Sequence, residues 1–120
     1  MQEKSILIIG GAGYIGSQVN NALSKNNLQT IVFDNLSRGN PQSVTNGLFI
    51  KGDTANREDL EAVFLQHPIS AVLHFAASIS VGESVKNPAL YYRNNLANTL
   101  NVLDCMQKYR VDQLVFSSTA

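Results

Sequence analysis

Two periodicities of apolar residues alternate along the chain. Short apolar runs rich in β-branched residues have the length of buried strands, and the longer segments between them repeat apolar residues at helical spacing. The pattern predicts strands at Ser5–Ile9, Thr30–Asp34, Leu48–Lys51, Ala71–Phe75 and Leu114–Ser117. It predicts helices at Tyr14–Asn26, Arg57–Gln66 and Pro88–Tyr109. The segment Leu36–Gly47, rich in Ser, Asn, Gly and Pro, is interpreted as a crossover loop or a frayed helix.

Polar residues at the helix boundaries support these assignments. Asn56 is a suitable N-cap, because its side chain accepts hydrogen bonds from free backbone N–H groups of the first turn. Asn87 followed by Pro88 forms an N-cap and first-turn pair, since proline lacks the N–H group that would be unbonded there. Asn26 is predicted to end the first helix in the left-handed conformation.

The predicted strands are apolar along their whole length, which is typical of a parallel sheet covered by helices on both faces. Right-handed crossovers then wind the chain in the Rossmann manner, with strand order 3-2-1-4-5. A chain of 120 residues is long enough for one such domain and too short for a second sizeable one. We therefore predict an α/β fold over residues 1–120, a five-stranded, Rossmann-like, doubly wound parallel sheet that is truncated relative to the complete fold.

Composition narrows the classes of function. The hydrophobic fraction of 44% and the charged fraction of 15% are those of an ordinary globular domain. Nine basic residues balance nine acidic ones, so neither nucleic acid nor a membrane surface is expected as a partner. The apolar runs are too short to span a bilayer, and the N-terminus does not resemble a signal peptide. Cys105 is the only cysteine, which argues against disulfides and a metal cluster, and the expected location is the cytoplasm.

A glycine-rich stretch, GGAGYIG, runs from Gly10 to Gly16 after the first predicted strand. A chain that turns sharply out of a buried strand needs residues without side chains where a pyrophosphate approaches the backbone, and the last glycine lets the next helix lie close to the sheet. Free N–H groups at the helix start face the anion. Glycines alone also make ordinary turns, but a strand before and a helix after favour a dinucleotide-binding loop.

Asp34 closes the second predicted strand. It follows Gly16 by close to the roughly 20 positions that separate the glycines from the carboxylate that binds the adenosine ribose in Rossmann folds. The plainer interpretation is a solvated strand-end aspartate that starts a turn. A carboxylate there repels a 2′-phosphate, so the expected cofactor is NAD rather than NADP. Arg38 opposes this inference, because a nearby arginine accommodates that phosphate.

Several further segments, together with the glycine stretch, carry a resemblance to a known family. They are Asp34-Asn35-Leu36-Ser37, Gly52-Asp53, His74-Phe75-Ala76-Ala77, Val81-Gly82-Glu83-Ser84-Val85, Pro88 to Asn94, and Phe116-Ser117-Ser118-Thr119-Ala120. Together they resemble the extended short-chain dehydrogenase/reductase superfamily and, within it, the UDP-glucose 4-epimerase family. The resemblance covers essentially the whole chain, and the segment from Val81 to Asn94 is its most specific part.

The resemblance implies roles for the matching positions. Residues expected at the cofactor pyrophosphate are Gly10, Gly13, Tyr14, Ile15 and Gly16. Those expected at the adenosine ribose are Asp34, Asn35, Leu36 and Ser37, and those bordering the adenine are Asp53 and Thr54. The passage toward the nicotinamide would be lined by Phe75, Ala76, Ala77, Ser78 and Asn94. Thr119 falls at the family's active-site Ser/Thr, whose hydroxyl bonds the sugar 4-oxygen, and is the catalytic candidate.

The implied activity is NAD-dependent epimerisation at C4 of a UDP-hexose, UDP-glucose to UDP-galactose, by transient oxidation to a 4-keto intermediate in a homodimer. The family's Tyr-x-x-x-Lys pair and sugar-binding domain would lie beyond Ala120, so these 120 residues alone are expected to be inactive. Ile9 and Ile79 depart from the family, in which many members have threonine and some have lysine, respectively. Two alternatives stay open: a nucleotide-sugar dehydratase or decarboxylase, and, for these residues alone, a non-catalytic dinucleotide-binding domain.

Four features of the later elements can be interpreted without the family. Asn94, Asn98 and Asn101 share one face of the long helix, and a buried polar role is expected for at least Asn94. Leu96, Leu100 and Leu103 form an adjacent stripe, interpreted as core packing or a helix–helix contact. His74 is expected to be packed and hydrogen-bonded rather than a catalytic base. Cys105 is expected to be buried and inert.

Overall fold

The computed structural model describes residues 4–10, 14–35, 47–75 and 88–116. Its strands are β1 (Ser5–Ile9), β2 (Thr30–Asp34), β3 (Leu48–Lys51), β4 (Ile69–His74) and β5 (Leu114–Phe116). Its helices are α1 (Tyr14–Lys25), α2 (Arg57–Gln66) and α4 (Pro88–Lys108). The predicted elements are therefore all present, and their boundaries differ from the prediction by at most two residues.

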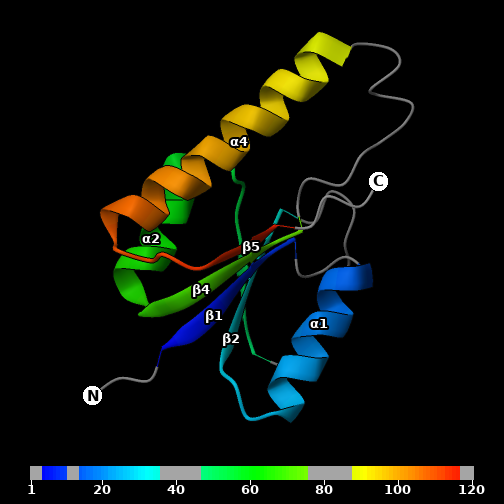
Figure 1. The fold of residues 1–120 in the computed structure, drawn as a ribbon, viewed down its shortest axis with the longest axis vertical. Helices are drawn as coiled ribbons and strands as arrows, with labels where there is room; N and C mark the ends of the chain where they lie inside the picture. The colour runs from blue at the N-terminus through cyan, green and yellow to red at the C-terminus, as the bar shows by residue number, and fades with distance from the viewer. Residues whose placement is uncertain (1–3, 11–13, 36–46, 76–87, 117–120) are drawn as a thin grey trace.

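The strands form one parallel sheet with the order β3-β2-β1-β4-β5, which confirms the predicted fold class and strand order (Figure 1). β1 lies at the centre, with β2 on one side and β4 on the other. The chain therefore builds outward from β1 to β3, then returns across the sheet to β4. This reversal beside β1 is the point at which folds of this class bind ligands, outside the carboxyl ends of the strands.

Helices cover the two faces of the sheet unequally (Figure 1). α2 and α4 lie together on one face, where their apolar side chains join one buried cluster with those of the strands. This cluster includes Leu7 and Phe33 from the sheet, Leu60 from α2 and Val102 from α4. Ile8, which alternates with Leu7 along β1, is also fully buried and points to the opposite face, where α1 lies.

Burial is complete only at the centre of the sheet. All of the apolar residues of β2 and the last three of β1 are buried, whereas Leu48 on β3 and both Val115 and Phe116 on β5 are exposed. The expectation that every strand is covered on both faces is therefore wrong for β3 and β5. The physical reason is their position, since both lie at the edges of the five-stranded sheet, where fewer neighbouring elements cover them.

The helix ends show which capping rules apply. The Asn56 side chain accepts a hydrogen bond from the Glu58 N–H at 3.0 Å, which confirms the predicted N-cap of α2. The predicted stop at Asn26 is wrong by one residue: Asn27 is the left-handed residue, with φ of 62°. The N–H of Leu28 then donates to the Leu23 carbonyl, and the N–H of Asn27 donates to the Ser24 carbonyl. These two bonds form a Schellman motif, which satisfies carbonyl groups that the helix end leaves unbonded.

The end of α4 repeats this motif without glycine or asparagine at the left-handed position. Arg110 has φ of 61°, and its N–H donates to the Gln107 carbonyl while the Val111 N–H donates to the Met106 carbonyl. Val111 is buried in the core cluster, so the turn carries an apolar side chain back onto the sheet.

Within the described ranges, no helix has both the length and the apolar character needed to cross a membrane.

β4 starts two residues earlier and ends one residue earlier than predicted. The ladder begins early because Ile69 pairs with Ser5, whose N–H donates to the Pro68 carbonyl at 2.8 Å. Phe75 lies just beyond the strand, although its N–H still donates to the Ile9 carbonyl at 2.7 Å. The predicted last residue of β5, Ser117, lies outside the described residues.

Candidate functional site

The register of the sheet brings the predicted site residues to one edge. Ile9 pairs with Phe33 on one side and with His74 on the other, so β1, β2 and β4 end at the same level. Gly10, Asp34 and Phe75 therefore follow or close three adjacent strands at the carboxyl edge. Neighbouring strands lie about 4.8 Å apart, so a ligand of nucleotide size spans all three strand ends.

Gly10 leaves β1 in a conformation that favours glycine. Its φ is 82°, in the left-handed region, and its N–H donates to the Phe33 carbonyl at 2.8 Å. The chain thus turns out of the sheet while it is still bonded to β2. Four residues later α1 begins at Tyr14, with Ile15 half exposed and Gly16 buried. The burial of Gly16 fits the expectation that the last glycine lets the helix approach the sheet closely.

Asp34 is the last residue of β2, and its side chain is partly exposed at the carboxyl edge, followed by exposed Asn35. Its backbone is fixed, because its carbonyl accepts a hydrogen bond from the Gly52 N–H at 3.1 Å. A carboxylate in this position, one strand away from Gly10, has the geometry expected of an acceptor for ribose hydroxyl groups.

Asp53 and Thr54 form a tight turn between β3 and α2. The Asp53 N–H donates to Oδ2 of Asp59 at 3.2 Å, and Oδ1 of Asp53 accepts from the Ala55 N–H at 2.9 Å. The Asp53 carbonyl accepts from the N–H of Asn56, the N-cap of α2. Asp53 is partly exposed, and among the described residues none donates a hydrogen bond to its Oδ2. Thr54 is buried.

His74 ends β4 beneath the carboxyl edge and is 2% exposed. Its ring lies against that of Phe116, with centroids 5.2 Å apart and planes tilted by 36°. Packing is therefore confirmed, but the predicted hydrogen bond is wrong within the described residues: neither ring nitrogen bonds to another side chain or backbone group there. Burial lowers the pKa of the imidazole, which favours the neutral form.

Several predicted site residues lie outside the described residues, and their assignments stay predictions. They are Gly13, Leu36, Ser37, Ala76, Ala77, Ser78 and Thr119, together with the side chains of Tyr14 and Asn94. Arg38, Ile79 and the predicted N-cap Asn87 lie outside them as well. In the part of the chain that the structure describes, no group of three or more His, Cys, Asp or Glu side chains is arranged to hold a metal ion.

The long helix α4 differs from its interpretation in two ways. Leu96, Leu100 and Leu103 are 60%, 48% and 39% exposed, so core packing within the described residues is wrong for this stripe, and the helix–helix contact stays a prediction. Cys105 is fully buried, as predicted. Asn101 makes a contact that sequence reasoning did not find: its Nδ2 donates to the Thr54 carbonyl at 2.9 Å. The unfavourable helix propensity of asparagine was the only signal for it.

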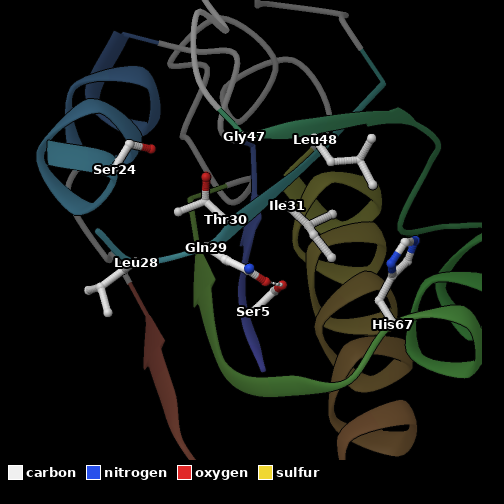
Figure 2. A pocket seen from close by; sticks show the side chains of 9 residues that line it. All are labelled: Ser5, Ser24, Leu28, Gln29, Thr30, Ile31, Gly47, Leu48 and His67. Carbon is white, nitrogen blue, oxygen red and sulfur yellow. Dashed lines mark hydrogen bonds between the residues drawn. The ribbon is translucent and has the colours of Figure 1, made fainter. Parts of the chain in front are cut away.

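A separate hollow of about 460 Å³ lies at the opposite, amino-terminal edge of the sheet (Figure 2). It is lined by Ser5, Ser24, Leu28, Gln29, Thr30, Ile31, Gly47, Leu48 and His67. The Thr30 hydroxyl is buried there without a hydrogen-bond partner in the described residues, and the Ser5 hydroxyl donates to Oε1 of Gln29 at 3.5 Å. None of the lining residues is a predicted site residue, so this hollow is not the candidate site.

Comparison with known proteins extends the resemblance to the whole chain. The model of the NAD dependent epimerase/dehydratase family matches residues 6–120. The chain belongs to this family. UDP-glucose 4-epimerase of Rhizobium meliloti (strain 1021) is 47% identical over 119 residues, which are 99% of this chain and 36% of that protein. The chain thus spans about a third of the length of the family members it matches.

Solved structures of family members share its fold. UDP-glucose 4-epimerase from Brucella ovis in complex with NAD matches with a TM-score of 0.91 and 40% identity, over 97% of this chain and 36% of that one. UDP-glucose 4-epimerase from Thermotoga maritima with UDP-glucose matches with a TM-score of 0.89 and 40% identity, over 96% and 38%. The chain therefore shares its fold with about a third of the length of each of these epimerase structures.

Proposed function

We propose that the full-length protein, meaning these residues with whatever the gene encodes after Ala120, binds NAD and interconverts UDP-glucose and UDP-galactose by epimerisation at C4. The family and the similarity to UDP-glucose 4-epimerases support this function, including relatives solved with NAD and with UDP-glucose. The observation that carries it is the placement of left-handed Gly10 and the Asp34 carboxylate on adjacent strand ends.

The described residues fit a dinucleotide. Gly10 has no side chain between the backbone and an approaching pyrophosphate, and the start of α1 supplies free N–H groups. The Asp34 carboxylate would accept hydrogen bonds from the adenosine ribose, and Oδ2 of Asp53 would face the adenine. Phe75, fixed to β1 by its backbone, would begin the passage toward the nicotinamide.

The chemistry divides between the cofactor and the chain. NAD, when bound, would supply the redox chemistry, as the acceptor and then the donor of the hydride at C4 of the sugar. Thr119 would hold the 4-oxygen with its hydroxyl and stabilise the charge that develops there. The Tyr-x-x-x-Lys pair, which the family resemblance implies after Ala120, would take the proton of the 4-hydroxyl.

An isotope experiment tests this function and separates it from its rivals. UDP-galactose labelled with deuterium at C4 is incubated with the full-length protein, and the products are identified by NMR and mass spectrometry. We expect UDP-glucose that retains the label at C4, because the same hydride returns to the same carbon. A 4-keto-6-deoxy sugar would indicate a dehydratase instead. No conversion, or loss of the label to solvent, would contradict the proposal.

The proposed assembly is a homodimer in the cytoplasm, with a role in galactose metabolism. The exposed stripe of Leu96, Leu100 and Leu103 on α4 supports a second copy as the partner, because exposed apolar surface of this kind favours association. The balanced charge supports neither nucleic acid nor a membrane as a partner. Light scattering of the full-length protein tests the dimer: Leu100→Lys should shift the mass toward the monomer, and an unchanged mass would contradict it.

A further inference from the structure

The turn at Asp53 and Thr54 is attached to three elements of the domain. Gly52, just before it, donates its N–H to the Asp34 carbonyl of β2. Asp53 is held by its bonds to Ala55, Asn56 and Asp59 at the start of α2. The third attachment is the hydrogen bond from Nδ2 of Asn101 on α4 to the Thr54 carbonyl, across 47 positions of sequence.

This third attachment differs in kind from the ion pairs nearby. Arg57 on α2 pairs with Asp104 on α4 at 3.3 Å, and Lys108 pairs with Glu61 at 3.2 Å, but each pair is open to solvent, with side-chain exposures of 47% and 50% in the first and 54% and 29% in the second. Exposed ion pairs are screened by solvent and hold their geometry weakly. The Asn101 bond is partly buried and ends on the backbone of the turn itself. Within the described residues it is the one side-chain hydrogen bond by which α4 holds that backbone.

We propose that Asn101 is a positioning residue for the adenine end of the cofactor site, an inference that rests on the proposed binding of NAD. By holding the Thr54 carbonyl, Asn101 fixes the peptide plane between Thr54 and Ala55, which also contains the Ala55 N–H. The Asx turn from Oδ1 of Asp53 to the Ala55 N–H spans that same peptide, so its geometry sets the direction of the free oxygen, Oδ2. Asn101 thus acts on the cofactor through Asp53, without touching it.

The helix that carries Asn101, α4, also carries a residue predicted at the other end of the cofactor. Asn94 lies seven residues earlier on the same face, about two turns or 10 Å along the axis. Asn94 is predicted at the nicotinamide passage, so one rigid helix would reach toward both halves of the dinucleotide. If Asn101 served packing alone, removing its side chain would weaken the binding of all ligands together. If it positions Asp53, removing it weakens only the binding that depends on the adenine end.

Asn101→Ala distinguishes these roles in the full-length protein. Alanine removes the donor yet has a higher helix propensity than asparagine, so the helix itself is not weakened. Asn98→Ala is the matched control, because Asn98 lies one turn away on the same face and no hydrogen bond from it to a described residue is found. Calorimetric titration measures binding of 5′-AMP and NAD⁺, with UDP as a probe of the rest of the protein.

We expect Asn101→Ala to weaken the binding of 5′-AMP and of NAD⁺ about 5- to 10-fold, as for the loss of one hydrogen bond. The affinity for UDP should not change. Asn98→Ala should bind all three ligands as the unaltered protein does. Amide exchange of Ala55, followed by NMR, should also become faster. Should Asn101→Ala fail to fold, Asn101→Asp, which keeps the side-chain shape, gives the same comparison.

Unchanged 5′-AMP affinity in a folded variant, or equal weakening of 5′-AMP and UDP, would overturn the role of Asn101 alone. If the unaltered protein bound neither 5′-AMP nor NAD⁺, the proposed function itself would fail, and the role of Asn101 with it.

Discussion

Gly52 precedes the turn that carries Asp53 and lies against the ring of Phe33. A Cβ atom at position 52 would stand 2.5 Å from Cε2 and 2.6 Å from Cζ of that ring, and 3.3 Å from Cβ of Asp59. A Cβ atom does not come closer than 3.0 Å to a non-bonded heavy atom, so either the Phe33 ring or the backbone of residue 52 would have to move. Phe33 is 1% exposed and packed in the core cluster, so its ring has no free space to enter. Gly52→Ala should therefore destabilise the domain through overpacking.

The magnitude follows from two opposing terms. Forcing an extra methyl group into a packed core costs about 1–3 kcal/mol. Replacing glycine by alanine also restricts the unfolded chain, which stabilises the folded state by about 0.4–1 kcal/mol where the backbone is compatible. The backbone of Gly52 is not in the left-handed region, so this second term applies. The two ranges leave a net loss in the free energy of unfolding of about 0–2.6 kcal/mol, with a midpoint of about 1.3 kcal/mol.

Urea unfolding, followed by circular dichroism because the chain has no tryptophan, measures this loss. A double-mutant cycle with Phe33→Leu identifies the cause, since leucine removes the ring atoms that the new methyl group meets. Gly52→Ala should cost at least about 1 kcal/mol less in the Phe33→Leu background than alone. An equal cost in both backgrounds would refute the steric argument, as would an unchanged free energy of unfolding for Gly52→Ala.

Three further changes have definite expected outcomes. Arg110→Gly should raise the free energy of unfolding by about 0.5–1 kcal/mol, because glycine adopts the left-handed φ of 61° without the cost that a Cβ atom brings; Arg110→Ala, which keeps that atom, is the control and should bring no gain. Burial lowers the pKa of His74 from its usual 6.5, so as the pH falls below 6.5 the unfolded chain takes up a proton that the folded chain excludes, and stability falls. This part of the pH dependence should vanish in His74→Leu, and an unchanged slope of stability between pH 6.5 and about pH 5 would contradict it. Thr119→Val should lower turnover of the full-length protein about 100- to 1000-fold with folding intact, and wild-type turnover would remove Thr119 from the site.

The centre of the fold was predictable because its signals are local or redundant. β1 and β2 are continuous apolar runs, and their bounds match the prediction at both ends. The cap at Asn56 depends only on its own side chain and the next turn. The end of α1 was missed by one residue because Asn26 and Asn27 both tolerate the left-handed conformation. The choice between them depends on the bond from the Leu28 N–H to Leu23.

Features set by tertiary contacts were not predictable. Arginine has no preference for the left-handed conformation, and the burial of Val111 imposes it on Arg110. The exposure of β3 follows from its place at the sheet edge, which no pattern within the strand reveals. The bond from Asn101 to Thr54 joins positions on separate elements, and only the folded chain brings them together. For the site, sequence reasoning placed Gly10, Asp34 and Phe75 at or just after strand ends, and the register brings these ends to one edge.

The central claim is that the carboxyl edge of this sheet binds NAD through Asp34. Titration of the full-length protein with NAD⁺ and NADP⁺, before and after Asp34→Ala, tests it directly. We expect a clear preference for NAD⁺, because the carboxylate repels a 2′-phosphate. In the variant, the loss of hydrogen bonds to a charged acceptor should weaken the binding of NAD⁺ about 10- to 100-fold. The preference for NAD⁺ over NADP⁺ should disappear. Equal affinity of the unaltered protein for both cofactors, or a variant that keeps the preference, would contradict the assignment of Asp34.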